Sequence, residues 1–382
     1  MYLGPRDHRS VSRIRILRRA IRPLAVVILA VTAVTAISAQ QQTKNVILIT
    51  LDGARTQEIF GGLDEEIFRS TNKSFQKTAT YKRFSAATAK ERREKLMPFF
   101  WKTLLVSYGS IAGDRELNSS VQTTNKLFFS YPGYSEMLTG QAHDDVIKSN
   151  SHPQNPYPSV LDFLQKKLKL DKDQVADFSS WDAFERISTN SPGKFVINAG
   201  YMAYDSTDKE IAGLSRAQFE TLPAWNGARF DYYTFRFALA HMRKFHPRVI
   251  HIGFDETDDW AHEKNYERLL QTLNMTDGFL KELWELVQTD PTYKGRTSFI
   301  ITTDHGRWKT IADWHDHGAD VAEAQNIWMA FFSPDVKLRG EWKDAETIYL
   351  NQVPATLCRY LNLDYSDQNP KAGKPIEQLF AE

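Results

Sequence analysis

The side chains best suited to chemistry in this sequence are aspartates and histidines spaced as metal ligands. Asp258 and His262 are four residues apart, a spacing that puts both on one face of a helix and lets both reach one ion. Asp304 and His305 are adjacent, and His317 follows in a polar loop. An acidic first turn of a solvated helix and ordinary surface histidines are the alternatives. The recurrence of Asp and His along the chain favours ligation.

Asp52 completes a set of six candidate ligands, enough to hold two ions and leave room for a substrate. Mixed Asp and His ligation suits Zn²⁺, and Mn²⁺ or Fe can also accept it. Two cations roughly 3.5–4 Å apart can hold the attacking and leaving oxygens of a displacement at phosphorus. We therefore expect two divalent metal ions, preferably Zn²⁺, and phosphoryl chemistry. The six residues are Asp52, Asp258, His262, Asp304, His305 and His317.

Ser130 is the candidate nucleophile. It follows an apolar run at residues 127–129 and precedes Pro132, a residue that suits the start of a helix. Its hydroxyl would then lie at the positive end of that helix. A helix-capping serine is the alternative, and position alone favours the cap. A neighbouring metal ion would change that balance, because it stabilises the alkoxide.

Three predicted strands would bring the acidic candidates together. Residues 44–51, 248–254 and 297–303 are rich in apolar and β-branched side chains, and they run directly into Asp52, Asp255 and Asp304. Ligands of open α/β sheets bind outside the carboxyl ends of the strands. One such aspartate could be a cap or a turn residue. Three strand ends of the same kind predict a shared site.

Strands alternate with helices along the rest of the chain, which predicts an α/β fold with a largely parallel central sheet flanked by helices. Further strands are expected at residues 174–178, 195–199 and 327–332. Helices are expected at residues 86–97, 158–168, 230–245, 266–287 and 352–361. Residues 56–122 lack clear periodicity, so we expect an insertion there that shapes the pocket.

The N-terminus has the pattern of a signal peptide. The first 22 residues hold seven arginines and one aspartate, and residues 24–39 follow without a charge and end in small side chains. The apolar stretch is short for a membrane span, which needs ~20 residues. We expect a cleaved signal peptide at residues 1–39, a catalytic domain at residues 40–382, and a periplasmic or secreted protein. Membrane contact is expected only if the segment stays uncleaved.

Composition narrows the classes of partner. The chain is 42% hydrophobic and 12% aromatic, which supplies ample core material. Removal of residues 1–39, with seven Arg and one Asp, takes away +6 and changes the formal charge from +1 to −5. A stable nucleic-acid partner is therefore not expected. Cys358 is the only cysteine, so no intrachain disulfide can form.

Several short motifs follow one another in a specific order. They are ILITLDGAR with Asp52, FSYPGYSEMLTG with Ser130, DDWAH from Asp258 to His262, TTDHG with Asp304 and His305, and HDHG with His317. In this order they resemble the alkaline phosphatase superfamily, most closely its type I phosphodiesterase/nucleotide pyrophosphatase and phosphoglycerate-mutase-like branches. Residues 350–363 and 373–376 resemble the helix and Gly-x-Pro ending common there. The resemblance covers most of the chain beyond residue 39.

This resemblance implies a covalent phospho-enzyme mechanism. Ser130 would attack phosphorus, metal ions would stabilise the leaving and non-bridging oxygens, and the phosphoserine would then be hydrolysed. The implied ligands are Asp258, His262 and His317 for one ion, and Asp52, Ser130, Asp304 and His305 for the other.

Two departures from the family patterns bear on the substrate. Nucleotide pyrophosphatases usually carry Thr-Phe-Pro-Asn, and Gly133 stands here where that asparagine would help to bind a phosphoryl oxygen. Asn125 and Arg55 are the candidate substitutes. Sulfatases mature a Cys or Ser in the motif [CS]-x-P-x-R, and Tyr134 replaces that arginine. Sulfatase chemistry is therefore disfavoured.

We therefore predict an exported, metal-dependent hydrolase that cleaves small-molecule phosphomonoesters or phosphodiesters through a phosphoserine at Ser130. A mutase that moves phosphate within one substrate would share the metal site, but it normally needs a capping domain, and export argues against it. A non-catalytic metal-binding protein is the third possibility, which the serine and the full ligand set disfavour.

Overall fold

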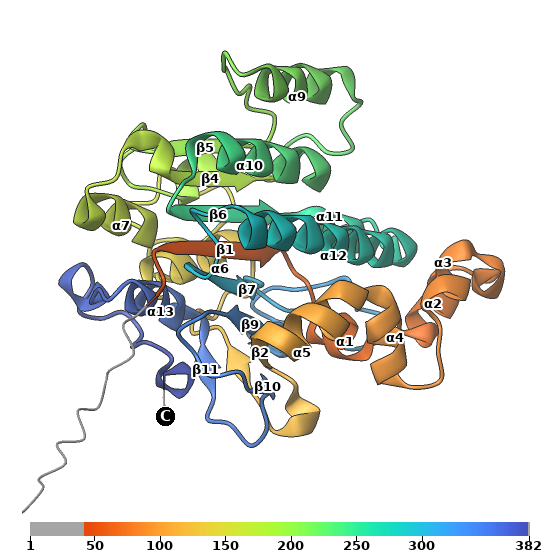
Figure 1. Cartoon of the computed structure of the whole chain (residues 1–382). Helices are drawn as coiled ribbons and strands as arrows, with labels where there is room; N and C mark the ends of the chain where they lie inside the picture. The colour runs from red at the N-terminus through yellow and green to blue at the C-terminus, as the bar shows by residue number, and fades with distance from the viewer. Residues whose placement is uncertain (1–41, 381–382) are drawn as a thin grey trace, which may run out of the picture. The chain divides into compact units, whose positions relative to one another are not determined.

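A computed structural model describes residues 42–380, so the expected signal peptide at residues 1–39 lies outside the described part. Within it, the central sheet has the strand order β10-β2-β9-β7-β1-β6-β4-β5 (Figure 1). A small second sheet has the order β11-β3-β8. The strands are β1 (Asn45–Leu51), β2 (Gly109–Ala112), β3 (Val121–Gln122), β4 (Val175–Ser179), β5 (Val196–Ala199), β6 (Val249–Phe254), β7 (Thr297–Thr302), β8 (Asn326–Ile327), β9 (Met329–Phe332), β10 (Gly340–Glu341) and β11 (Ile348–Tyr349).

The strands from β7 to β5 in this order all pair in parallel, and β9 adds to β7 in the antiparallel sense. The connections between the parallel strands carry helices, as such crossovers require. The α-helices are α1 (Thr56–Gly61), α2 (Glu65–Thr71), α3 (Ala79–Phe84), α4 (Ala89–Leu96), α5 (Leu105–Tyr108), α6 (Ser130–Thr139), α7 (Val160–Leu168), α8 (Phe184–Ile187), α9 (Lys209–Glu220), α10 (Asp231–Phe245), α11 (Glu256–His262), α12 (Tyr266–Thr289) and α13 (Val353–Tyr360). The expected α/β fold with a largely parallel sheet is confirmed.

Helices cover both faces of the sheet, and β1 shows how its sequence divides between them. Ile47, Ile49 and Leu51 lie in one hydrophobic core with side chains of α10 and α12. Val46 and Leu48 lie in the other with side chains of α6, α7 and α13. Successive side chains of a strand point to opposite faces, so a strand covered on both sides must be apolar throughout. This explains why the run that precedes Asp52 is apolar except for Thr50.

The segment expected to be an insertion, residues 56–122, contains α1 to α5 and supplies β2 and β3. It is anchored to α12, because the carboxylate of Asp277 accepts hydrogen bonds from the backbone amides of Phe99 and Phe100 at 2.9 and 2.7 Å. A cavity of about 580 Å³ lies between this segment and the side chains of Lys309 and Glu323. None of the candidate metal ligands lines it.

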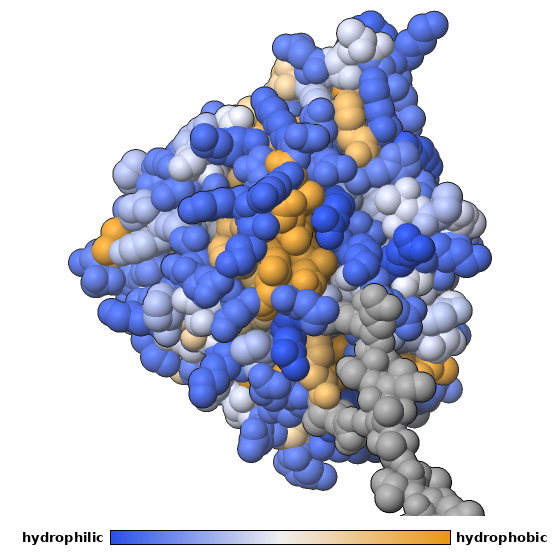
Figure 2. Space-filling view, turned by 60° about the vertical axis from the view of Figure 1, so that its left-hand side comes forward, coloured by the Kyte–Doolittle hydropathy of each residue, from blue (hydrophilic) through white to orange (hydrophobic). Residues whose placement is uncertain are grey.

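The remaining predicted helices and strands lie within three residues of their expected bounds, except that the strand expected at residues 327–332 is divided into β8 of the second sheet and β9 of the central sheet. The face of the molecule in Figure 2 is mostly hydrophilic, with a hydrophobic patch near its centre. None of the helices within residues 42–380 has the length and hydropathy that crossing a membrane would need.

Candidate metal and nucleophile site

Strand register brings the predicted ligands to one edge of the sheet. Leu51, the last residue of β1, pairs with Phe254 at the end of β6, and Thr50 pairs with Thr302 at the end of β7. The chain leaves these three strands at Asp52, Asp255 and Thr303, so Asp52, Asp258 and Asp304 come together. Parallel strands in register end at the same level, which makes this convergence a property of the fold.

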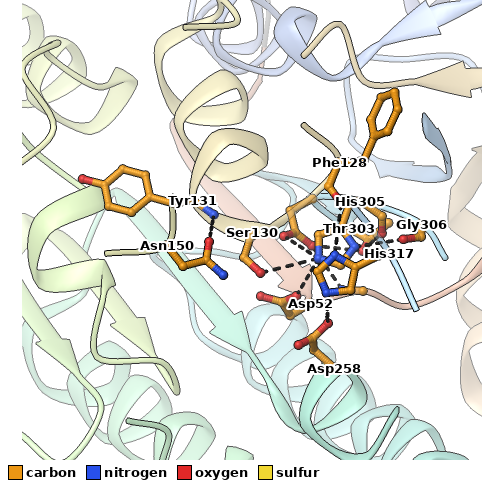
Figure 3. Close-up of polar contacts among 12 residues, drawn as sticks. Asp52, Phe128, Ser130, Tyr131, Asn150, Asp258, Thr303, His305, Gly306 and His317 are labelled. Carbon is orange, nitrogen blue, oxygen red and sulfur yellow. Dashed lines mark hydrogen bonds and ion pairs between the residues drawn. The ribbon is translucent and has the colours of Figure 1, made fainter. Parts of the chain in front are cut away.

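The Nε2 atom of His305 lies at the centre of the cluster (Figure 3). It is 3.4 Å from Asp52 Oδ1, 3.5 Å from Asp304 Oδ2 and 3.8 Å from Asp258 Oδ1. The Oγ of Ser130 is 3.5 Å from the same nitrogen. Ligand-type atoms from three strand ends and the first turn of α6 therefore face one small volume.

The other ring nitrogen of His305 fixes which atom faces this volume. Nδ1 lies 2.9 Å from the backbone carbonyl of Gly306, which can only accept, so Nδ1 carries the proton and donates it. In metal sites the ligating histidine typically makes this second hydrogen bond, which sets its tautomer and ring orientation. Burial opposes a charged imidazole, but the carboxylates of Asp304 and Asp52 outweigh it and raise the pKa of His305 to about 9.

The carboxylates of the cluster fit a cation that the protein itself does not supply. Asp52 Oδ1 and Asp304 Oδ2 are buried and have no hydrogen-bond partner. Burial, followed by the charge of Asp52, raises the pKa of Asp304 to about 7. Asp52, Asp304 and His305 each offer one ligand atom, and these atoms lie within 4.8 Å of one another. Buried oxygens that lack donors are costly unless a positive charge compensates them, so the residues fit a divalent metal ion.

A second group of ligand-type atoms adjoins the first. Asp258, His305 and His317 also offer atoms within 4.8 Å of one another. His262 lies beside them, because its Nε2 is 3.0 Å from Asp258 Oδ2 and 3.1 Å from His317 Nε2. Burial, followed by the charge of His305, lowers the pKa of both His262 and His317. Neutral imidazoles are the form that binds metals. All six predicted ligands are thus brought together, with His262 the most exposed at 51% of its side chain.

Phe128 holds His317 in place through an unusual backbone conformation. Its φ is +50°, which bulky residues rarely adopt. Its backbone amide donates to Asn125 Oδ1 at 3.0 Å, and its carbonyl lies 3.1 Å from His317 Nδ1. The Phe128 ring packs with Val321 and Ala324. Such conformations persist only where the surroundings enforce them. Here the conformation directs the carbonyl of Phe128, two residues before Ser130, toward His317.

Ser130 does not act as a helix cap. The N-cap position of α6 is Phe129, and Ser130 is the first residue of the helix. Its side chain is 5% exposed, and its hydroxyl faces His305. The capping alternative raised by the sequence is therefore not what the structure shows. The hydroxyl lies at the N-terminal end of a ten-residue helix, where partial positive charge favours an anion.

The expected substitutes for the missing asparagine, Asn125 and Arg55, are both wrong. The Nδ2 of Asn125 donates to Glu136 at 2.8 Å, and its Oδ1 accepts from the amides of Leu127 and Phe128. The buried guanidinium of Arg55 is paired with Glu58 and with the carbonyl of Trp308. Both side chains are committed to local structure, which spacing along the sequence did not reveal.

Gly133 is explained by packing. A Cβ at this position would lie 2.6 Å from the backbone oxygen of Asp304, closer than real contacts allow. Helix α6 therefore rests directly on the ligand-bearing loop. No side chain at position 133 could reach a phosphoryl group from here, so the glycine is not a lost donor.

Two residues of the site were missed from the sequence. Asn150 accepts a hydrogen bond from the amide of Tyr131 at 2.9 Å through Oδ1, beside Ser130 (Figure 3). Its Nδ2 remains available as a donor at this exposed position. Arg307 is buried, donates to the carbonyl of Gly53 at 3.2 Å and contacts the carboxylate of Asp258. Arg307 directly follows the TTDHG motif, so the sequence could have indicated it. Asn150 lies in a loop without periodicity, and no sequence pattern indicates it.

The close contact at Gly133 predicts that Gly133→Ala destabilises the protein, because the added methyl must push α6 away from Asp304. Overpacking of this kind costs about 1–3 kcal/mol. The matched control is Gly278→Ala in α12, where an added Cβ meets nothing within 4 Å and where Ala is favoured over Gly by about 1 kcal/mol. Thermal unfolding should show a lower Tm for the first variant and an unchanged or higher Tm for the second. Equal Tm shifts would contradict the packing.

The ligand geometry predicts that Asp304→Asn lowers metal content. The amide removes a negative charge from a buried oxygen cluster, so affinity for a divalent cation should fall by at least tenfold, the scale of losses already seen when supporting residues change. The control is Asp313→Asn, at an exposed position outside the cluster. Metal per chain is measured by elemental analysis after dialysis against Zn²⁺ or Mn²⁺ and gel filtration. Retention of wild-type metal content by Asp304→Asn would refute the assignment.

Comparison with known proteins agrees with this geometry. A family model described as the Metalloenzyme superfamily matches residues 232–365, a range that includes every candidate ligand except Asp52 and Ser130. None of the curated proteins matches the sequence.

Solved structures resemble the chain in fold at low sequence identity. A 2-O GAG sulfatase has a TM-score of 0.55 and 14% identity, with 89% of this chain and 75% of that chain covered. A phosphonate monoester hydrolase of Agrobacterium radiobacter has a TM-score of 0.55 and 11% identity, with 88% and 77% covered. An alkaline phosphatase superfamily protein from Vibrio parahaemolyticus has a TM-score of 0.51 and 14% identity, with 90% and 71% covered. The fold is thus alkaline phosphatase-like, and the predicted resemblance to the metalloenzymes of that superfamily is confirmed.

Proposed function

We propose that the protein is a metal-dependent hydrolase of phosphate esters that acts through a phosphoserine at Ser130. The observation that carries this proposal is the position of the Ser130 hydroxyl, 3.5 Å from His305 Nε2 and free of any capping role. A nucleophile at the meeting point of two ligand groups is the arrangement that displacement at phosphorus needs.

The two ligand groups would hold two divalent ions, preferably Zn²⁺ with Mn²⁺ as the alternative. One group would be Asp258, His262 and His317, and the other Asp52, Asp304, His305 and Ser130. When bound, such ions supply positive charge that lowers the pKa of a hydroxyl and neutralises phosphoryl oxygens.

The chain's own residues then act on the substrate. The Ser130 Oγ forms the bond to phosphorus as the ester oxygen leaves with its electron pair, and water later cleaves the phosphoserine to release phosphate or a monoester. The Nδ2 of Asn150 would donate to the phosphoryl oxygens, whose negative charge grows during the reaction. Asn150 suits this role because its Oδ1 is already fixed by the amide of Tyr131.

Tyr134 supports phosphate over sulfate. It stands where sulfatases carry the arginine of their maturation motif, and its side chain is 1% exposed and packs on Phe184 with ring centroids 4.5 Å apart. The similarity in fold to sulfatases therefore does not favour sulfatase chemistry. Export remains part of the proposal, because the N-terminal pattern of residues 1–39 is that of a signal peptide.

The first experiment compares hydrolysis of p-nitrophenyl phosphate, bis-p-nitrophenyl phosphate and p-nitrophenyl sulfate by metal-loaded protein lacking residues 1–39. We expect turnover of at least one phosphate ester and none of the sulfate. Ser130→Ala should reduce kcat by at least about 10³, since nucleophile removal leaves only the background from binding and charge stabilisation. Ser135→Ala, on the same helix and also buried, is the control and should retain activity.

Each contrary outcome is informative. Hydrolysis of the sulfate ester alone would replace the proposal by sulfatase chemistry. Intramolecular phosphate transfer without release of free phosphate would indicate a mutase. No turnover of any ester by protein with two bound ions would indicate a non-catalytic metal-binding protein.

Asn150 yields a separate prediction within the same assay. Asn150→Ala should lower kcat by about 10²–10³, the usual cost of one lost donor to a developing negative charge. The Tm should fall only slightly, because the variant loses one hydrogen bond, to the Tyr131 amide, worth about 1 kcal/mol. Lys148→Ala, an exposed neighbour in the same loop, serves as the control. Unchanged kcat for Asn150→Ala would remove this residue from the site.

A further inference from the structure

An apolar groove lies at the edge of the sheet where the parallel strands begin, opposite the edge that carries the candidate site. It has a volume of about 300 Å³ and lies between the ends of α5 and α12 and the segment that follows β9. Tyr108 and Trp284 line it with ring centroids 4.8 Å apart, and Leu338 lines it and is 49% exposed. None of the described residues that line it is charged. Grouped apolar side chains of this kind typically mark a site of interaction.

A basic pocket of about 590 Å³ adjoins this groove. Lys44, Arg248 and Arg296 line the pocket, and the residues on either side of Arg296, Gly295 and Thr297, line the groove. The backbone holds these cations in place. The amide of Lys44 donates to the carbonyl of Arg296 at 2.8 Å, and Arg248 Nε donates to the carbonyl of Lys44 at 3.0 Å. An apolar and a basic surface are therefore continuous along one edge of the sheet.

The cations of this edge are available to a ligand outside the chain. Within residues 42–380, the side chains of Lys44, Arg248 and Arg296 form no ion pair. Lys294 and Lys337 are exposed and stand next to residues that line the groove. Unpaired cations around an apolar groove are complementary to a surface that is both anionic and apolar.

Three acidic side chains at the same edge already have partners. Asp290 Oδ2 lies 3.1 Å from His246 Nε2, and Glu285 Oε1 lies 3.8 Å from Lys281 Nζ. The carboxylate of Asp335 accepts two backbone amides at the point where the described chain begins, at 2.6 and 2.7 Å. These carboxylates therefore do not neutralise the basic pocket.

The chain enters its described part beside this groove. The amide of Thr43 donates to Asp335 at 2.7 Å, and Thr43 Oγ1 lies 2.6 Å from Ser298 Oγ, which donates to Ser333 Oγ at 2.7 Å. Ser333 lines the groove. Residues 24–39 carry no charge and are predominantly apolar, and the three residues that join them to Thr43 span at most about 11 Å. Any bilayer that held residues 24–39 would therefore lie close to this edge.

We propose that this edge of the sheet is a docking face for an anionic lipid bilayer, and that it acts without residues 1–39. Tyr108, Trp284 and Leu338 would enter the boundary between headgroups and acyl chains, where aromatic side chains with a polar tip are favoured. Lys44 and Arg296 would lie against lipid phosphates. The inference does not depend on the proposed reaction.

Charge favours a lipid surface over a second copy of the chain. In a symmetric dimer the same patch meets itself, so the cations around the groove would be brought together and would repel one another. The chain without residues 1–39 has a formal charge of −5, which opposes a nonspecific approach to an anionic bilayer. Binding would therefore take place through this edge and in one orientation.

Such docking would direct the candidate site toward solvent. β1 has seven residues, so roughly 23 Å separates its two ends at about 3.3 Å per residue. The ligand cluster lies at the far end of this strand. A docked enzyme would therefore take its substrate from the aqueous phase, in agreement with a small-molecule ester.

Cosedimentation with lipid vesicles tests the docking face. Residues 41–382 form one compact unit, so the protein is used without residues 1–39. The vesicles contain either phosphatidylcholine and phosphatidylglycerol in equal parts or phosphatidylcholine alone. We expect binding to the mixed vesicles that weakens at high salt, because salt screens exposed charges. Lys44→Gln combined with Arg296→Gln should lower the partition coefficient by about 25-fold, since each cation near an anionic leaflet contributes about fivefold.

Leu338→Ser tests the apolar part of the face and should lower the partition coefficient by about fivefold, because about half of the leucine is available for burial. The charge control is Lys73→Gln combined with Lys77→Gln. These exposed lysines lie between α2 and α3, on the right of Figure 1, whereas β1 begins on its left. The control should bind within about twofold of wild type. Both charge variants should keep the wild-type Tm, because these four side chains make no hydrogen bond or ion pair within residues 42–380.

Three results would each overturn the docking face: no binding to the mixed vesicles, an equal loss in the control, or wild-type binding by the Lys44 and Arg296 variant. A dimer in sedimentation velocity that Leu338→Ser dissociates, together with no vesicle binding, would make this face an interface between copies and also overturn the proposal. The ester assay tests the hydrolase separately, so either proposal can fail while the other stands.

Discussion

Repulsion between carboxylates at one edge of the sheet is the constraint on which the rest of this structure depends. Atoms of Asp52 and Asp304 lie within 4.8 Å of each other in a buried cluster. Two like charges at that distance repel by about 3 kcal/mol at an effective dielectric of 20. His305 and Arg307 offset part of this charge from within the chain. The unpartnered oxygens that remain, Asp52 Oδ1, Asp258 Oδ1 and Asp304 Oδ2, fit an additional cation.

Close approach of backbone segments follows from the need to crowd so many ligand atoms together. Gly53 has φ +57°, and a Cβ there would lie 2.6 Å from Asp258 Oδ1. Gly133 lets α6 rest on the backbone of Asp304, and Phe128 adopts a left-handed conformation to present its carbonyl to His317. The left-handed backbone and the missing side chains at these positions let six ligand-type side chains and Ser130 share one small volume.

The fold alone leaves the reaction open, because sulfatases and phosphonate monoester hydrolases share it with this chain. The chain differs from them in the residues around Ser130. Tyr134 is buried against Phe184 at the position of the arginine in the sulfatase motif, and Asn150 lies beside Ser130 with its Oδ1 bonded to the amide of Tyr131. Asn150 therefore lies where the proposed reaction needs a neutral hydrogen-bond donor.

The sequence by itself determined most of the elements and which candidate ligands lie together, because hydrophobic periodicity is local and parallel strands end at a common edge. The apolar and β-branched runs before Asp52 and Asp304 are enough to predict both the buried strands and the convergence of their ends. Only the tertiary structure decided that Ser130 is not a cap, that Asn125 and Arg55 are committed elsewhere, and that Asn150 and Arg307 matter. The hydrogen-bond partners of these side chains depend on packing angles and side-chain direction, which hydrophobic periodicity does not encode.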